Sequence, residues 1–158
     1  MAVTVGPPFM AVLALAAWAV ATARRNVGLV DIFWSLFLLL AAAVYVFFSP
    51  DPGARALLTL ALVAAWSLRL AGYLAARNWN APEDHRYRAI RARNEPGFAW
   101  KSLYIVFGLQ AVLAWLVAAP LAAAIGAPGP LGAFAVAGAV LVIFGIAWET
   151  IGDTQLAR

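Results

Sequence analysis

The stretch that decides the fold is LLTLALVAAWSLRLAGYLAA, residues 57–76, in which Arg69 is the single charged residue. An apolar run of about 20 residues is long enough to cross the hydrocarbon core of a bilayer as an α-helix. A charge near the middle of such a helix costs about 2.5–3.5 kcal/mol on insertion scales, so it normally faces the interior of a helix bundle. The stretch therefore predicts a transmembrane helix that needs neighbours.

Further apolar runs of suitable length supply those neighbours. The chain is 65% hydrophobic and 11% charged, whereas soluble domains carry roughly 25% charged residues. Turn residues such as SPDPGAR and GAPGP separate the runs. We therefore expect residues 1–158 to form a single all-α domain, a polytopic membrane bundle of about five transmembrane helices. The expected helices are 8–23, 29–49, 56–76, 102–125 and 130–151.

The loops differ strongly in basic charge. Residues 77–101 carry six lysines and arginines, and Arg24 and Arg25 lie two helices earlier, on the same side of the bundle. Loops that are rich in lysine and arginine stay in the cytoplasm. We therefore expect the N-terminus outside and the C-terminus in the cytoplasm.

Two scarce residue types exclude several chemistries. The chain has no cysteine and a single histidine, His85. Disulfides, thiolate catalysis and metal centres built on cysteine or histidine clusters are therefore excluded. We expect no metal site and no nucleic-acid partner.

Four charged residues fall at the expected cytoplasmic half of the spans: Asp31, Arg69, Glu149 and Asp153. Glu149 and Asp153 share one helix face, where like charges repel, and they lie near a helix C-terminus, which prefers cations. They need a partner: Arg69, Arg77, a loop arginine or the hydroxyl groups of a ligand. For Arg69 we consider pairing with Asp31 or Glu149. The alternatives are that Arg69 snorkels to the interface and that water solvates the acids.

An aromatic and basic stripe accompanies these charges. Trp66, Arg69, Tyr73 and Arg77 follow one another at intervals of three or four residues, so they share a helix face. The stripe leads into the basic segment at 77–101.

Within the basic segment, EDHRYR (residues 83–88) interleaves acids, arginines and aromatic rings. Arginine binds phosphate in a bidentate manner, carboxylates accept hydrogen bonds from ribose hydroxyls, and Tyr87 or Trp79 can stack on a flat ring. The pattern suits a polyphosphate ligand with hydroxyls and a ring. Binding of anionic lipid headgroups is the alternative, and it accounts for most of Arg91 and Arg93.

Five motifs now occur in a recognisable order: VDIFW (30–34), WSLRL (66–70), Arg77, EDHRY (83–87) and ETIGDTQL (149–156). Together they resemble bacterial membrane proteins grouped with the steroid 5-alpha-reductases. The resemblance implies a seven-helix reductase of the bacterial inner (plasma) membrane. It also implies that NADPH enters from the cytoplasm and gives a hydride to an enone or activated double bond of a lipid or steroid-like substrate.

The resemblance also assigns roles to residues. It implies catalytic roles for Asp31, Trp66 and Tyr73, although Asp31 stands where the steroid enzymes have glutamate and Trp66 falls about where they place a tyrosine. It implies cofactor binding by Arg69, Arg77, Asp84, Arg86, Tyr87, Glu149 and Asp153.

The family continues beyond the acid pair with an Arg-His-Pro-Asn-Tyr stretch and further cofactor contacts. We therefore expect this chain to be the N-terminal portion of such an enzyme, inactive alone and completed by a missing segment or a second chain. Two alternatives stay open. One is an isoprenylcysteine-methyltransferase-like enzyme that uses S-adenosylmethionine, and the other is a non-catalytic membrane scaffold or lipid-binding subunit.

Overall fold

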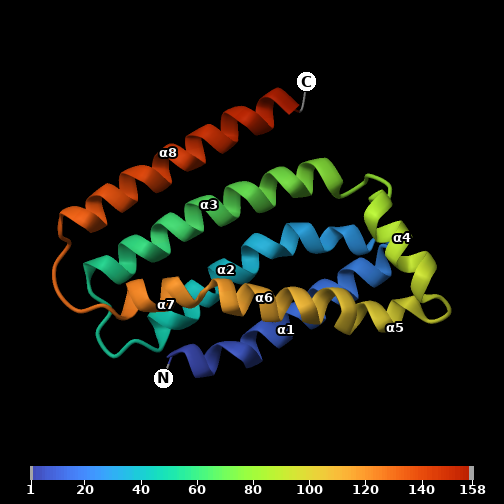
Figure 1. The fold of residues 1–158 in the computed structure, drawn as a ribbon, viewed down its shortest axis with the longest axis horizontal. Coiled ribbons are helices and arrows are strands. Elements are labelled where there is room, and N and C mark those ends of the chain that lie inside the picture. Colours follow the sequence, from blue (N-terminus) through green and yellow to red (C-terminus); the bar gives the residue numbers. More distant parts are fainter. Residues whose placement is uncertain (1, 157–158) are drawn as a thin grey trace.

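The computed structural model describes residues 2–156, which form an all-helical bundle without strands (Figure 1). Five of its helical segments are long and apolar enough to cross a membrane, as expected: Val5–Ala23, Val27–Phe47, Ala54–Asn78, Phe98–Gly126 and Ala133–Leu156. The elements in chain order are α1 (Ala2–Ala23), η1 (Val27–Leu29), α2 (Val30–Phe47), α3 (Ala54–Asn78), α4 (His85–Asn94), α5 (Phe98–Ser102), η2 (Leu103–Gly108), α6 (Leu109–Val117), α7 (Ala119–Gly126) and α8 (Ala133–Leu156).

The fourth span is not a uniform α-helix. It begins as α5, passes through the π-helical turn η2 and continues as α6 and α7. A β-carbon at Gly108 would lie 3.2 Å from the carbonyl oxygen of Leu103, so the small residue suits the distorted turn. Pro120 lies in the first turn of α7, where a missing backbone N–H costs nothing because that donor has no helical acceptor.

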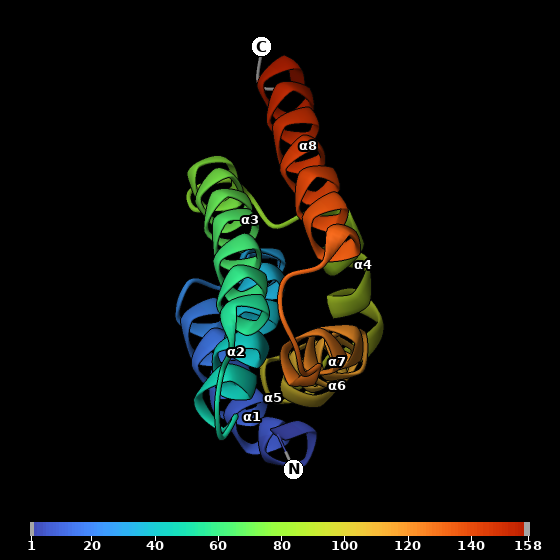
Figure 2. The ribbon, with the colours of Figure 1, turned by 90° about the vertical axis from the view of Figure 1, so that its left-hand side faces the viewer.

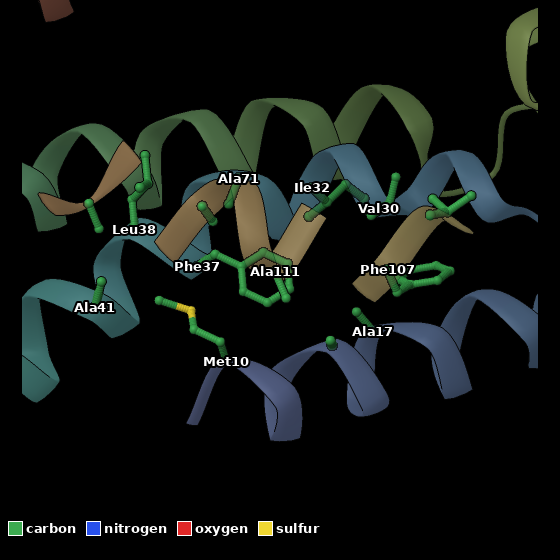
Figure 3. Close-up of a cluster of buried hydrophobic side chains, with 14 of the residues drawn as sticks. Met10, Ala17, Val30, Ile32, Phe37, Leu38, Ala41, Ala71, Phe107 and Ala111 are labelled. Atoms are coloured by element: carbon green, nitrogen blue, oxygen red, sulfur yellow. The ribbon is translucent and has the colours of Figure 1, made fainter. Parts of the chain in front are cut away.

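The core of the bundle lies around α2. This helix packs against α1, α3, α6 and α7. The phenyl rings of Phe37 and Phe107 are fully buried, and the small residues Ala17, Ala41 and Ala111 let the helices approach closely (Figure 3).

The last helix lies at the edge of the bundle. Both views show α8 beside α3, on the side away from α1 (Figures 1 and 2). None of its described residues is buried. Its helix runs to Leu156, five residues beyond the expected end at 151, and therefore carries both Glu149 and Asp153 within its final turns.

A polar cap, which consists of α4 and the connections on either side of it (residues 79–97), covers one end of the bundle. The short helix α4 crosses this end next to the α1–α2 turn (Figure 1). At the opposite end lie the α2–α3 and α7–α8 connections. The six lysines and arginines of residues 77–101 are therefore gathered at the capped end.

We predict that this capped end faces the cytoplasm. The chain has no cysteine, so a single cysteine reports one position. Ala92→Cys, on the exposed side of α4, should react with a membrane-impermeant maleimide only after the membrane is permeabilised. Asp51→Cys, in the exposed α2–α3 connection, is the matched control and should react in intact cells. The reverse pattern would show that the orientation is wrong.

Candidate functional site

Arg69 is held between two carboxylates of α8. Its guanidinium group forms salt bridges with Glu149 and Asp153. The side chains are 18% exposed for Arg69, 22% for Asp153 and 47% for Glu149. Arginine does not lose its proton in proteins. The two acids therefore compensate a positive charge that is permanent within the span. Of the two partners considered from the sequence, Arg69 contacts Glu149; in the described residues it forms no salt bridge with Asp31.

Two aromatic side chains complete this arrangement. The indole Nε1 of Trp66 donates a hydrogen bond to Glu149 Oε2 at 3.1 Å. The Tyr73 hydroxyl donates to the backbone oxygen of Asp153 at 3.3 Å. We call these five residues (Trp66, Arg69, Tyr73, Glu149 and Asp153) the carboxylate cluster. The structure thus brings the predicted stripe of α3 against the predicted acid pair of α8.

Asp31 belongs to a different arrangement. Its Oδ1 accepts a hydrogen bond of 2.6 Å from the Tyr87 hydroxyl, and its Oδ2 lies 3.6 Å from Nη2 of Arg86. Asp31 lies in the first turn of α2, where a negative charge interacts favourably with the helix dipole. Tyr87 packs against Gly28, where a β-carbon would come within 3.3 Å of the ring. The absent side chain therefore makes room for the Asp31–Tyr87 contact.

A polar pocket of about 320 Å³ lies next to this pair. Of the predicted residues, Asp31, Arg77, Asp84 and Arg86 line it. Arg77 also stacks over the Tyr73 ring at 5.5 Å, so it connects the polar pocket with the carboxylate cluster. The predicted residues therefore fall into two neighbouring groups rather than one.

Two asparagines in the pocket were not predicted. Asn26 caps η1 through a hydrogen bond from the Gly28 N–H at 3.0 Å and donates to the Ala81 oxygen at 3.1 Å. Asn78 accepts a hydrogen bond from Nε of Arg77 at 2.9 Å. The sequence does hold a signal for Asn26, because asparagine is a preferred residue just before a helix. Asn78 has no comparable signal.

Glu83 joins α4 to the α1–α2 turn. Its Oε1 accepts hydrogen bonds from the Val27 N–H and from Arg91, and its Oε2 accepts a second one from Arg91. Burial alone would raise the pKa of this carboxyl, but these hydrogen bonds outweigh burial and lower the pKa below its ordinary value. Arg91 is therefore paired with Glu83.

Hydrogen bonds and burial shift the pKa of two groups at the start of α4. Asp84 caps α4 by accepting from the Arg86 N–H at 2.8 Å, and the side-chain hydrogen bond from Arg86 lowers the pKa of this carboxyl. Burial, helped by the hydrogen bond to Asp31, raises the pKa of Tyr87. Tyr87 therefore keeps its proton at neutral pH and acts as a donor.

An apolar cavity of about 350 Å³ adjoins the carboxylate cluster at Trp66. It lies between α3, α7 and α8, and Trp66 is part of its wall. The other lining residues are mostly aliphatic: Arg55, Leu58, Thr59, Leu62, Val63, Leu121, Ala124, Ala135, Gly138, Ala139 and Val142. Trp66 therefore separates an apolar cavity from a cluster of charges. Across residues 2–156 the acids and His85 form no group suited to hold a metal ion.

The family described as "Protein of unknown function (DUF1295)" matches residues 17–158, and so includes both groups of the site. No curated protein and no solved structure matches the chain.

We predict strong energetic coupling between Arg69 and Asp153. Arg69→Ala leaves two acids without their cation, and loss of one member of a buried pair typically costs about 3–5 kcal/mol; partial exposure places the expected cost near the lower value. The same substitution in an Asp153→Ala background should cost less, with a coupling of about 1–2 kcal/mol. Unfolding in detergent micelles measures these free energies.

The matched control for this cycle pairs Arg69→Ala with Asp31→Ala. Because Asp31 contacts Tyr87 and Arg86 instead, these effects should add within about 0.5 kcal/mol. Additive effects for Asp153 as well would show that the salt bridge does not stabilise the bundle.

We also predict that Glu83 stabilises the polar cap in a pH-dependent manner. A carboxyl whose pKa is lower in the folded state than in the unfolded state stabilises the fold above its unfolded pKa. At pH 7, Glu83→Gln should therefore lower the melting temperature. The difference from the unsubstituted protein should shrink as the pH falls below the ordinary carboxyl value of 4.5. A difference that stays constant from pH 7 to pH 3 would contradict the ionised state of Glu83.

Proposed function

The chain belongs to the DUF1295 family, and we propose that it is the nucleotide-binding and lipid-binding part of an NADPH-dependent membrane reductase, similar to the steroid 5-alpha-reductases. The observation that carries the proposal is the position of Trp66. Its indole donates to Glu149 of the carboxylate cluster, and its ring lines the apolar cavity. A site for charged groups and a cavity for a lipid thus meet at one side chain.

The residues of the polar pocket suit a dinucleotide. Arg77 and Arg86 offer guanidinium groups for phosphates, and Asp31 and Asp84 offer carboxylate oxygens for ribose hydroxyls. In the carboxylate cluster, Nε of Arg69 is buried and has no hydrogen-bond partner in the described part of the chain. The pocket and the cluster would hold the phosphate and ribose portions of the cofactor, with Arg77 between them.

When bound, a reduced nicotinamide supplies a hydride to an electron-poor carbon. The side chains described above do the remaining work. The aliphatic walls between α3, α7 and α8 exclude water and hold the apolar body of the substrate. Tyr87 keeps a proton on its hydroxyl oxygen, and Asp31 fixes the direction of that O–H group. Arg69 compensates the charge of the two acids of the carboxylate cluster, one of which accepts a hydrogen bond from Trp66 in the wall of the apolar cavity.

Two features support a lipid substrate in a bacterial plasma membrane. The apolar cavity lies between membrane-length helices, so a substrate can enter it from the bilayer. The polar pocket lies at the basic end of the bundle, which the distribution of lysine and arginine assigns to the cytoplasm, where a soluble nucleotide is available. We therefore propose a lipid or steroid-like enone, or another activated double bond, as the substrate class.

We predict that NADPH, and not S-adenosylmethionine, raises the melting temperature of a longer relative that also carries the Arg-His-Pro-Asn-Tyr stretch implied by the resemblance. The aspartate that matches Asp153, changed to asparagine, should weaken NADPH binding about 10- to 100-fold. A lost hydrogen bond to a charged group is worth roughly 1.5–3 kcal/mol, and about 1.4 kcal/mol is a tenfold change. Fluorescence titration of NADPH in nanodiscs measures the loss.

The aspartate that matches Asp51, in the α2–α3 connection, is the matched control, and its change to asparagine should leave binding unaltered. Stabilisation by S-adenosylmethionine instead of NADPH would support the methyltransferase alternative. Stabilisation by neither ligand would support a non-catalytic subunit.

A further inference from the structure

A seam between α1 and the fourth span carries two cavities that the proposed function does not use. The first, of about 280 Å³, lies at the capped end and is bordered by Thr22, Arg25 and Ser102. The second, of about 340 Å³, follows the same two helices into the span and is bordered by Ala11 and Tyr104. The lining of the second cavity is almost entirely apolar.

The two cavities belong to one surface. Ala11, Ala14, Trp18 and Thr22 follow one another at intervals of three or four residues along α1, so they share a helix face. Trp18 crosses the seam between the cavities, because its indole N–H donates to the backbone oxygen of Ala99 at 2.7 Å. A molecule with a polar end and a long apolar tail matches this succession.

The cavity at the capped end has a cation and a hydroxyl that are without partners among the described residues. Arg25 adopts a left-handed backbone conformation with φ of 52°, which is uncommon for residues other than glycine. It forms no salt bridge with any described residue, whereas Arg91 in the same cavity is occupied by Glu83. The Thr22 hydroxyl has no hydrogen-bond partner in the described part of the chain. A guanidinium and a hydroxyl are donors suited to a phosphate group.

The neighbouring aromatic residues fit a membrane interface at this level. The rings of Trp18 and Trp100 pack with their centroids 5.0 Å apart, and Trp100 is largely exposed. Tryptophan and tyrosine are enriched at the headgroup level of membranes. The charged end of the seam therefore lies where headgroups lie, and the apolar cavity lies where acyl chains lie.

The second cavity of the seam lies against the π-helical turn η2. Leu103, Tyr104 and Gly108 of η2 form one wall, opposite α1. Turns of this kind occur frequently at functional sites. Glycine at 108 leaves the wall without a side chain at that point.

We propose that this seam binds one anionic phospholipid, with its phosphate at Arg25 and Thr22 and an acyl chain in the groove beside η2. The order of charge, aromatic rings and apolar surface along α1 supports this occupant over a free phosphate ion, which would leave the groove empty. It also supports it over a second copy of the chain, which would have to bring an anion to Arg25.

Native mass spectrometry of the purified chain tests the proposal with phosphatidylglycerol and phosphatidylcholine of identical acyl chains. The chain should retain phosphatidylglycerol about fivefold better, the ratio expected for one basic residue near an anionic lipid. Arg25→Gln should abolish this preference, while Arg93→Gln, an exposed arginine of α4 outside both cavities, should keep it. Ala11→Phe should fill the groove and reduce retention of both lipids, while Ala16→Phe, exposed on another face of α1, should not.

Three outcomes would overturn the proposal. Equal retention of both lipids by the unsubstituted chain would remove the headgroup site. Displacement of phosphatidylglycerol by millimolar inorganic phosphate would show that the cavity at the capped end is a site for a free anion. A dimer that Ala11→Phe dissociates would show that a second copy of the chain occupies the groove.

Discussion

The permanent charge of Arg69 within a membrane span is the constraint on which the arrangement of α8 depends. In a bilayer, lipid tails are as apolar as the helix surfaces, so apolar contact alone gives little drive for helices to associate. No described residue of α8 is buried, and α3 is the helix on which it packs. The salt bridges from Arg69, together with the hydrogen bonds from Trp66 and Tyr73, therefore determine where α8 lies.

The same constraint creates a site. Trp66 lies one helical turn before Arg69 on the same face of α3, so the acid pair that compensates Arg69 has a neighbour, Trp66, that also lines an apolar cavity. Arg77, two turns after Arg69, extends the face to the polar pocket. One face of α3 thus runs from the apolar cavity, past Trp66, to the polar pocket, which is the order that the proposed reaction between a lipid and a soluble cofactor requires.

Length and hydropathy predicted the five spans, since a helix that crosses a bilayer needs about 20 apolar residues. Spacing predicted that Glu149 and Asp153 need an external partner, either an arginine or the hydroxyl groups of a ligand. The choice of partner could not be predicted, because it depends on the rotation of each helix about its axis. Asp31 and Arg69 lie in neighbouring helices, yet α4 folds back over the start of α2 and brings Tyr87 and Arg86 to Asp31. The π-helical turn likewise has no clear pattern in the sequence.

The polar cap depends on a second buried charge. Glu83 stands in a segment that reads as a basic loop, yet its side chain is only 9% exposed. By accepting from the Val27 N–H and from Arg91, it ties the start of the second span to α4. Residues of the α1–α2 turn, of α3 and of α4 form the walls of the polar pocket. The hydrogen bonds of Glu83 therefore hold the wall from the α1–α2 turn and the wall from α4 together. Glu83 also pairs with Arg91, whereas Arg25 in the α1–α2 turn forms no salt bridge with any described residue. One carboxylate therefore both holds a wall of the proposed nucleotide pocket in place and pairs one of the two arginines that border the cavity at the capped end.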